Sequence, residues 1–240
     1  MKRSNKRIYL LLMLFYSSIS LSAISIDRTR VIFNGDESSM SISVYNRNAE
    51  KPYLAQAWLE SLAKEKIDKP FIVTPPIQRI DANEKSQIQI EALPSVKLLP
   101  QDRESAFYFN VREIPPKPTK ANTLQLALQT QVKLFYRPEK IVVTSTELTN
   151  NPWQEKLLVL KKSDGIHLDN PTPYYITILD ISSKKNKMED IPMVAPFSSI
   201  PLHYNKDNFS NDLILTYIND FGGRIKMKYT CNQYECSVKK

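Results

Sequence analysis

The sequence predicts an all-β protein made of two sandwich-like domains. Apolar residues recur at every second position from Ile24 onward, and turn residues such as Asn34-Gly35 interrupt these runs. No long stretch has the spacing of an amphipathic helix. Hydrophobic residues make up 42% and charged residues 24% of the 240, near the averages for globular proteins. Disordered, collagen-like and polytopic membrane classes are therefore disfavoured, and one large domain or two of about 110 residues are expected.

The first half of the chain has the strand count of an immunoglobulin-like sandwich. Each run of alternating apolar residues ends at turn residues, which is typical of short antiparallel strands. About seven such strands precede residue 140, which matches the number and spacing in immunoglobulin-like domains. The clearest runs are Val31 and Phe33; Met40, Ile42 and Val44; Tyr53 to Leu59; Ile88 and Ile90; Phe107, Phe109 and Val111; and Leu124 to Tyr136.

The second half predicts a less regular β domain. Asn151-Pro152-Trp153 indicates a helix start, with Asn as the cap and Pro in the first turn, and a short helical turn should then enter a strand. The alternation pauses between Arg137-Pro138 and Thr149, so we place the N-terminal domain at 23–144 and the C-terminal domain at 145–240. Further alternating runs are expected near Tyr174 to Ile181, Leu213 to Ile218 and Ile225 to Tyr229.

Residues 1–22 have the layout of a secretory signal peptide. Four basic residues and no acid precede or flank the nine apolar residues from Ile8 to Tyr16, and small polar residues follow. Nine apolar residues are too few to cross a bilayer as a helix, which argues against a membrane anchor. The small residues at Ser20 and Ser22 favour cleavage before Ala23, and cleavage after Ala23 is the neighbouring alternative. We therefore expect an exported, soluble protein whose formal charge falls from +8 to +4 on processing.

Export gives the two cysteines a structural role. An oxidising compartment favours a disulfide between Cys231 and Cys236, whose four intervening residues suit a link across a terminal hairpin. A zinc site is the competing interpretation. It needs about four ligands, and the chain's two histidines, His167 and His203, have no pair spacing between them. We expect the disulfide and no metal.

Composition and motifs exclude several classes of function. The chain has four glycines, where average usage would give roughly seventeen, and none has the spacing of a phosphate-binding loop. Basic residues are scattered among acids without a recognition-helix or RNA-binding signature, so a solvated surface is favoured over a nucleic-acid site. No Gly-x-Ser-x-Gly elbow is present, and two distant histidines give little basis for a catalytic triad. We expect a non-enzymatic protein without cofactors.

The run from Asn122 to Pro138 is longer than a typical strand of five or six residues. Its apolar face carries leucine at every second position at its start, whereas Lys133 lies at the opposite parity. The part from Val132 to Tyr136 fits an ordinary half-buried strand, and the earlier part is expected to project past the sandwich. A projecting apolar edge promotes aggregation unless a partner covers it. The alternating leucines are Leu124, Leu126 and Leu128.

At these residues the chain resembles the periplasmic chaperones of pilus assembly of the PapD type, over nearly all of 23–240. The resemblance implies two immunoglobulin-like domains set in a boomerang with a cleft between them. It also implies a periplasmic protein that binds pilus subunits and delivers them to an outer-membrane usher. The short connection PPKPTKAN resembles the branch that serves rod-like pili. The matching segments are IDRTRVIFNG at 26–35, YLAQAWLE at 53–60, LPQDRESAFYFNVREIPP at 99–116, LQLALQTQVKLFYRP at 124–138, NPTPYY at 170–175 and YINDFGG at 217–223.

The resemblance also assigns roles to individual residues. Arg30 and Lys133 match the family's basic cleft pair, which holds the carboxylate at the end of the subunit. The three leucines match the strand that enters the subunit's groove by β-augmentation. An interdomain charge cluster that fixes the angle between the domains is implied at Glu104, Arg137 and Asp220.

Two other classes of function compete with this interpretation: a structural pilin or adhesin, and a secreted carbohydrate-binding β-sandwich. A pilin should carry a donor segment at its own N-terminus, whereas Ile26 here begins a core strand almost at once. A sugar-binding sandwich should cluster aromatic residues on one face, whereas the Tyr and Phe residues fall mainly within alternating strand patterns. The sequence leaves open the cognate subunits, the target of the pilus, and self-association of the free protein to hide its exposed edge.

Overall fold

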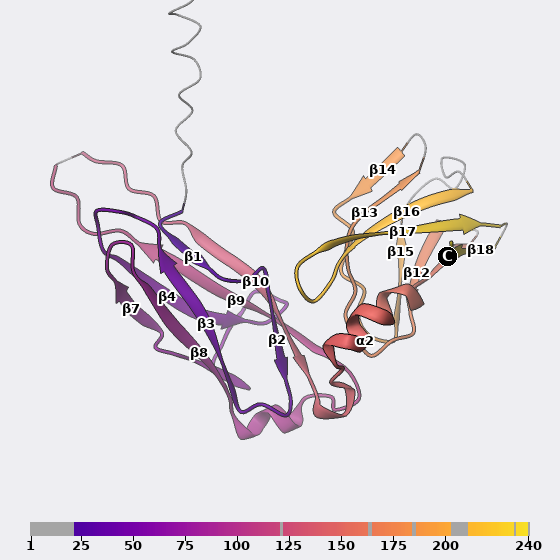
Figure 1. The fold of residues 1–240 in the computed structure, drawn as a ribbon, viewed down its shortest axis with the longest axis horizontal. Helices are drawn as coiled ribbons and strands as arrows, with labels where there is room; N and C mark the ends of the chain where they lie inside the picture. The colour runs from indigo at the N-terminus through magenta and orange to yellow at the C-terminus, as the bar shows by residue number, and fades with distance from the viewer. Residues whose placement is uncertain are drawn as a thin grey trace, which may run out of the picture.

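The chain forms two β domains joined at an angle (Figure 1). The all-β, two-domain immunoglobulin-like fold expected from the sequence is confirmed. Among the described residues, no helix is long and apolar enough to cross a membrane. His203 and the expected signal peptide, apart from Ser22, lie outside the described part of the chain. The computed structural model describes residues 22–120, 122–162, 165–183, 186–202, 211–232 and 234–239.

The first domain packs two sheets around one core. One sheet has the strand order β1-β3-β8-β6, and the other has the order β2-β10-β9-β4-β5, with β7 also paired to β4. A short 3-10 helix, η2 (Pro94–Leu98), precedes β9. The strands are β1 (Ile24–Ile26), β2 (Arg30–Asn34), β3 (Ser39–Asn46), β4 (Tyr53–Glu60), β5 (Lys66–Ile67), β6 (Phe71–Thr74), β7 (Ile77–Ile80), β8 (Lys85–Ala92), β9 (Ser105–Ile114) and β10 (Gln129–Arg137).

Aromatic residues fill the end of this core that lies nearest the second domain. The Phe71 ring lies 5.0 Å from Phe33, 5.7 Å from Phe107 and 5.6 Å from Tyr136, measured between ring centroids. Phe33, Phe107 and Tyr136 come from β2, β9 and β10 of one sheet, and Phe71 comes from β6 of the other. The two-residue period of each strand therefore points these rings into the core between the two sheets.

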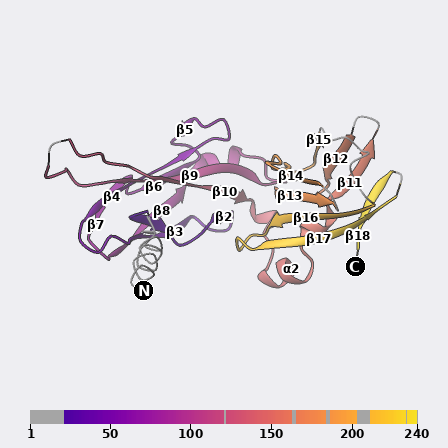
Figure 2. The same ribbon diagram turned by 90° about the horizontal axis from the view of Figure 1, so that it is seen from above.

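The strand expected from Asn122 to Pro138 is shorter than the sequence pattern suggested. Regular pairing begins only at Gln129, where β10 runs antiparallel to β9. Residues 122–128 belong to the connection between β9 and β10, which projects beyond the sandwich in both views (Figures 1 and 2). Apolar alternation persists there, but within the described residues the segment pairs with no strand in a regular ladder, and its backbone contact with β9 is the bond from Glu113 N–H to the Leu128 carbonyl, over 3.0 Å.

Strand β2 pairs in parallel with β10, from Arg30 beside Lys133 to Asn34 beside Arg137. Gly35 then donates its N–H to the Arg137 carbonyl over 2.7 Å. A Cβ at position 35 would lie 2.7 Å from the backbone N of Glu139, so glycine is needed for this close approach. The pairing places β2, near the start of the first domain, alongside the second half of β10, the last strand of that domain.

The segment between the domains contains a helix that the sequence analysis missed. Helix α2 (Ser145–Asn150) begins at a capping box: Thr144 Oγ1 accepts from the N–H of Glu147, and Glu147 Oε2 accepts from the N–H of Thr144. Asn151 is therefore the C-cap of α2, not an N-cap, and Pro152 is the N-cap of the next turn. The expected short helical turn before a strand is present as a 3-10 helix. The two 3-10 helices of the linker are η3 (Glu139–Ile141) and η4 (Trp153–Lys156).

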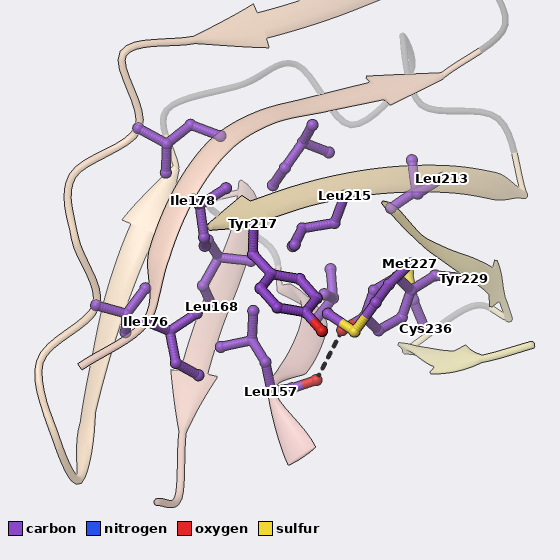
Figure 3. Close-up of a cluster of buried hydrophobic side chains, with 14 of the residues drawn as sticks. Leu157, Leu168, Ile176, Ile178, Leu213, Leu215, Tyr217, Met227, Tyr229 and Cys236 are labelled. Carbon is purple, nitrogen blue, oxygen red and sulfur yellow. Dashed lines mark hydrogen bonds between the residues drawn. The ribbon is translucent and has the colours of Figure 1, made fainter. Parts of the chain in front are cut away.

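The second domain is built from one eight-stranded sheet in the order β14-β13-β16-β17-β18-β11-β12-β15, which curves around its own core. Figure 3 shows this core, in which the Tyr229 hydroxyl donates to the Leu157 carbonyl over 3.2 Å. The three alternating runs expected here correspond to β13, β16 and β17. The strands are β11 (Leu158–Lys162), β12 (Gly165–Asn170), β13 (Thr177–Ser183), β14 (Asn186–Glu189), β15 (Ser198–Leu202), β16 (Asp212–Ile218), β17 (Arg224–Cys231) and β18 (Glu235–Val238).

Candidate functional site

Three leucines are exposed to solvent on the connection that leads into β10. Leu124 is 84% exposed, Leu126 68% and Leu128 45%. Leucine is usually buried, and three exposed leucines at alternating positions form an apolar edge that water solvates poorly. On the core side of the same run, Val132 and Leu134 are buried as expected. The run therefore divides into a core strand and an exposed apolar segment.

Two cations lie side by side at the end of that segment. Arg30 and Lys133 are directly paired in the parallel register of β2 and β10. Arg30 is only 8% exposed, its Nη1 donates to the Ile218 carbonyl over 3.1 Å, and its Nε has no hydrogen-bond partner among the described residues. Neither cation forms an ion pair with a described residue. A buried donor without a partner and a neighbouring ammonium together favour an incoming anion.

Burial and mutual repulsion act on both cations. Burial lowers the pKa of Arg30, although the charges of Asp220 and Glu104 oppose that shift. Burial also lowers the pKa of Lys133, and the positive charges of Arg30 and Lys64 lower it further. A carboxylate placed between Arg30 and Lys133 would relieve this repulsion.

Arg30 also borders a pocket between the domains. Arg30 lies over the Phe135 ring, 5.7 Å from its centroid, and that ring lies 5.8 Å from Tyr175 of the second domain. The described lining comes from the first domain at Asp27, Arg28, Thr29, Arg30 and Ile32, and from the second at Asp220, Phe221 and Gly222. The site is thus open to a ligand that approaches along the cleft.

The three residues of the implied charge cluster do meet at the domain junction. Arg137 donates from Nε and Nη2 to Glu104 Oε1 over 2.9 and 2.7 Å, and from Nη2 to Asp220 Oδ2 over 2.8 Å. Glu104 Oε2 accepts from the backbone N–H of Tyr175 over 2.7 Å. The Arg137 guanidinium also lies 4.9 Å from the Trp153 ring centroid. One arginine therefore links a carboxylate from each domain.

The ionisation of this cluster is set by its burial. The side chains of Arg137 and Glu104 are each 2% exposed. Burial raises the pKa of Glu104 to about 7, while the Arg137 charge and the Tyr175 N–H oppose the rise. Removing the arginine would leave a carboxyl group that strongly prefers its protonated form.

The predicted disulfide between Cys231 and Cys236 is present and joins paired positions of β17 and β18. Figure 1 places β18 and the chain end on the side of the second domain away from the leucine segment. The disulfide therefore stabilises the second domain and lies apart from the cleft. No group of metal-ligating residues occurs within the described ranges.

Several residues at the junction were not found by sequence reasoning. Phe135 is an apolar residue at a position of β10 where the alternation predicts a polar one. This departure was the signal that both faces of β10 are buried near its end. Gly222 has a φ of +81°, and a Cβ there would lie 2.2 Å from Thr29 Oγ1 in the other domain. Only the docking of the two domains shows that glycine is required at this contact.

Comparisons with known proteins match both domains to one family. Residues 23–142 match the family model described as pili and flagellar-assembly chaperone, PapD N-terminal domain, and residues 152–229 match the model of the pili assembly chaperone PapD, C-terminal domain. The chaperone protein PapD of Escherichia coli is 45% identical over 95% of this chain and 94% of its own length. The chaperone protein PmfD of Proteus mirabilis is 42% identical over 95% and 91%.

Solved structures show the same fold. A chain from the structure of the Salmonella enterica SafA pilin in complex with the SafB chaperone superimposes with a TM-score of 0.73 at 25% identity, covering 89% of this chain and 99% of that one. The YadV chaperone superimposes with a TM-score of 0.69 at 34% identity, covering 88% and 100%. This family is one of chaperones and not an enzyme class, and neither a pilin nor a carbohydrate-binding sandwich accounts for matches to both domains. The chain belongs to the PapD family of pilus-assembly chaperones.

Proposed function

We propose that this protein is a periplasmic chaperone that completes the fold of pilus subunits by donating its exposed leucine segment as a β-strand. The observation that carries the proposal is the continuity of that segment with the cleft cations. The segment that carries Leu124, Leu126 and Leu128 leads directly into β10. Within β10, Lys133 lies beside Arg30 of β2. An incoming strand that pairs with the segment would bring its chain end toward the two cations.

The two halves of this site would act differently on a subunit. The leucines would supply affinity, because fully burying a leucine contributes about 1.5 to 3 kcal/mol. Arg30 and Lys133 would set the register of the paired subunit strand, because they would bind the carboxylate at the end of the subunit chain. Every subunit carries that carboxylate at the same place, its last residue. Neither step consumes a nucleotide or needs a cofactor. The complex would then be delivered to an outer-membrane usher.

The charge cluster at the junction would keep the cleft at a fixed angle. Glu104 and Asp220 come from different domains and share Arg137. The SafA–SafB structure contains a pilin bound to a chaperone of this fold. It supports pilus subunits as the partners of this chain. The cognate subunits would be those encoded by its own host.

Copurification from the native periplasm tests the proposal. The tagged wild-type chain should recover small pilin-like subunits, and Arg30→Ala should recover few or none. Arg28→Ala is the matched control, because Arg28 lies two residues away, lines the same pocket and is paired with Asp27 at 2.8 Å. Equal recovery by Arg30→Ala and Arg28→Ala would contradict the anchor. Absence of any pilin-like partner on the wild type would contradict the function itself.

A further inference from the structure

Glu113 is a buried carboxylate that the cleft does not use. It lies in β9, is 5% exposed, and forms no ion pair with any described residue. Buried carboxylates are normally paired with a cation, because loss of hydration disfavours an isolated charge. Among the described residues, Glu113 therefore lacks the cation that normally pairs with a buried carboxylate.

The contacts of Glu113 point to the start of the first domain. Its Oε2 accepts from the backbone N–H of Ile24 over 3.0 Å and from the Ser22 hydroxyl over 3.0 Å. Ala23 lies between these two donors, is 8% exposed, and accepts at its carbonyl from the N–H of Arg47 over 2.6 Å. One carboxylate oxygen thus contacts the chain on both sides of the expected cleavage point.

We propose that Glu113 binds the N-terminal ammonium group that removal of the signal peptide creates. Cleavage before Ala23 would free an amine between two groups that already contact Glu113 Oε2. Cleavage after Ala23 would place the ammonium on Ile24 N, 3.0 Å from that oxygen. Both cleavage points considered from the sequence therefore give the carboxylate a cation. Cleavage before Ala23 also keeps the bond from Arg47.

The other charged groups near this position do not fill the same role. Arg47 lines the same pocket, but its Nε donates to Ser25 Oγ over 3.0 Å and its guanidinium lies over the Tyr45 ring. The remaining titratable groups of the lining are Glu50, which is exposed and of the wrong sign, and Tyr53. The new ammonium would be the nearest cation available to Glu113.

Pairing at Glu113 would also reach the leucine segment. The Glu113 N–H donates to the Leu128 carbonyl over 3.0 Å, and Oε1 lies 3.4 Å from the Leu128 N. Leu126 and Leu128 line the same pocket as Ala23. Removal of the signal peptide would therefore stabilise the position of Leu128, where the leucine segment joins β10. This consequence rests on the proposed strand donation, whereas the ion pair does not.

The first experiment uses the wild-type protein alone. Intact mass of the periplasmic form should show a start at Ala23 or Ile24, and any other start would overturn the proposal. The pKa of the α-amine, followed by its acetylation rate against pH, should lie about one unit above the ordinary 7.7 to 8.0. An ordinary value in the folded protein would also overturn it.

The second experiment measures coupling between the amine and the carboxylate. In the native mature chain, Glu113→Gln should lower the folding equilibrium constant about tenfold, which corresponds to one pKa unit. In a chain with two glycines inserted before Ala23, the same substitution should change it by no more than about twofold. Glu50→Gln, an exposed carboxylate of the same pocket, should have no effect in either chain. Equal losses for Glu113→Gln in both chains would overturn the ion pair.

A binding assay separates this inference from the proposed function. If the native chain binds a pilus subunit and the glycine-extended chain binds it several-fold more weakly, the link from Glu113 to Leu128 is supported. If both chains bind equally while the coupling is present, the ion pair stands and its effect on the segment is refuted. If neither chain binds a subunit, the proposed function fails, and the coupling still decides the role of Glu113.

Discussion

Truncation of the exposed leucines gives the sharpest test of strand donation. A change of leucine to alanine removes three carbons, at about 0.8 kcal/mol for each buried group. Only surface that is exposed in the free protein can be newly buried on binding. Leu126 is 68% exposed, so Leu126→Ala should cost about 1.6 kcal/mol of binding free energy, or roughly fifteenfold in Kd.

The same arithmetic predicts an order among the three positions. Leu124, at 84% exposed, should cost about 2 kcal/mol, and Leu128, at 45%, about 1.1 kcal/mol, or roughly thirtyfold and sixfold in Kd. The free energy of unfolding of each variant should stay within about 0.5 kcal/mol of wild type, since exposed side chains contribute little to folding.

Competition for a subunit measures these values. A subunit that copurifies with the wild type is offered to tagged wild-type protein and an untagged variant, and the partition gives the ratio of affinities. Leu98→Ala is the matched control, because Leu98 is 87% exposed and lies in η2, outside the segment. Equal losses for Leu98→Ala and Leu126→Ala would contradict strand donation by this segment, and so would a Leu126→Ala variant that fails to fold.

Three further predictions concern the junction and the disulfide. Arg137→Met should lower the free energy of unfolding by about 3 to 5 kcal/mol at pH 8, measured by urea denaturation, and equal stability would contradict a structural role for the cluster. In the folded protein the pKa of Glu104 is raised from 4.5 to about 7, so its contribution to stability is present below pH 4.5 and is lost as the pH rises through 7. The loss of unfolding free energy caused by Arg137→Met should therefore shrink toward pH 5. Gly222→Ala should lower the free energy of unfolding by about 1 to 3 kcal/mol, because φ is +81° there and the added Cβ would meet Thr29. Gly165 also has a positive φ, so an equal loss for Gly165→Ala would indicate that backbone strain alone is responsible. Reduction of the Cys231–Cys236 disulfide should cost about 2 kcal/mol, given the five-residue separation, without changing subunit affinity, and a matching loss of affinity would place the disulfide in the binding site.

The two-residue period of the sequence predicted most of the strands and their buried faces. A two-residue period needs no knowledge of the partner strand, so the alternation around Val31, Ile42 and Phe109 was sufficient to predict buried faces. The cap of α2 could also have been read from the sequence, because Thr144 and Glu147 have the spacing of a capping box. Pro152 marks the start of the following 3-10 helix instead.

The end of a strand and the exposure of the leucine segment could be seen only in the tertiary structure. Apolar residues recur at every second position from Leu124 to Tyr136 except at Thr130, but β10 begins only at Gln129. A strand requires a hydrogen-bonded neighbour, and the sequence does not say where that neighbour lies. The same limit applies to the contacts of Arg137 and Gly222, which join residues that are far apart along the chain. Periodicity is a local property of the chain, whereas pairing, domain docking and the burial of Glu113 depend on which distant residues meet.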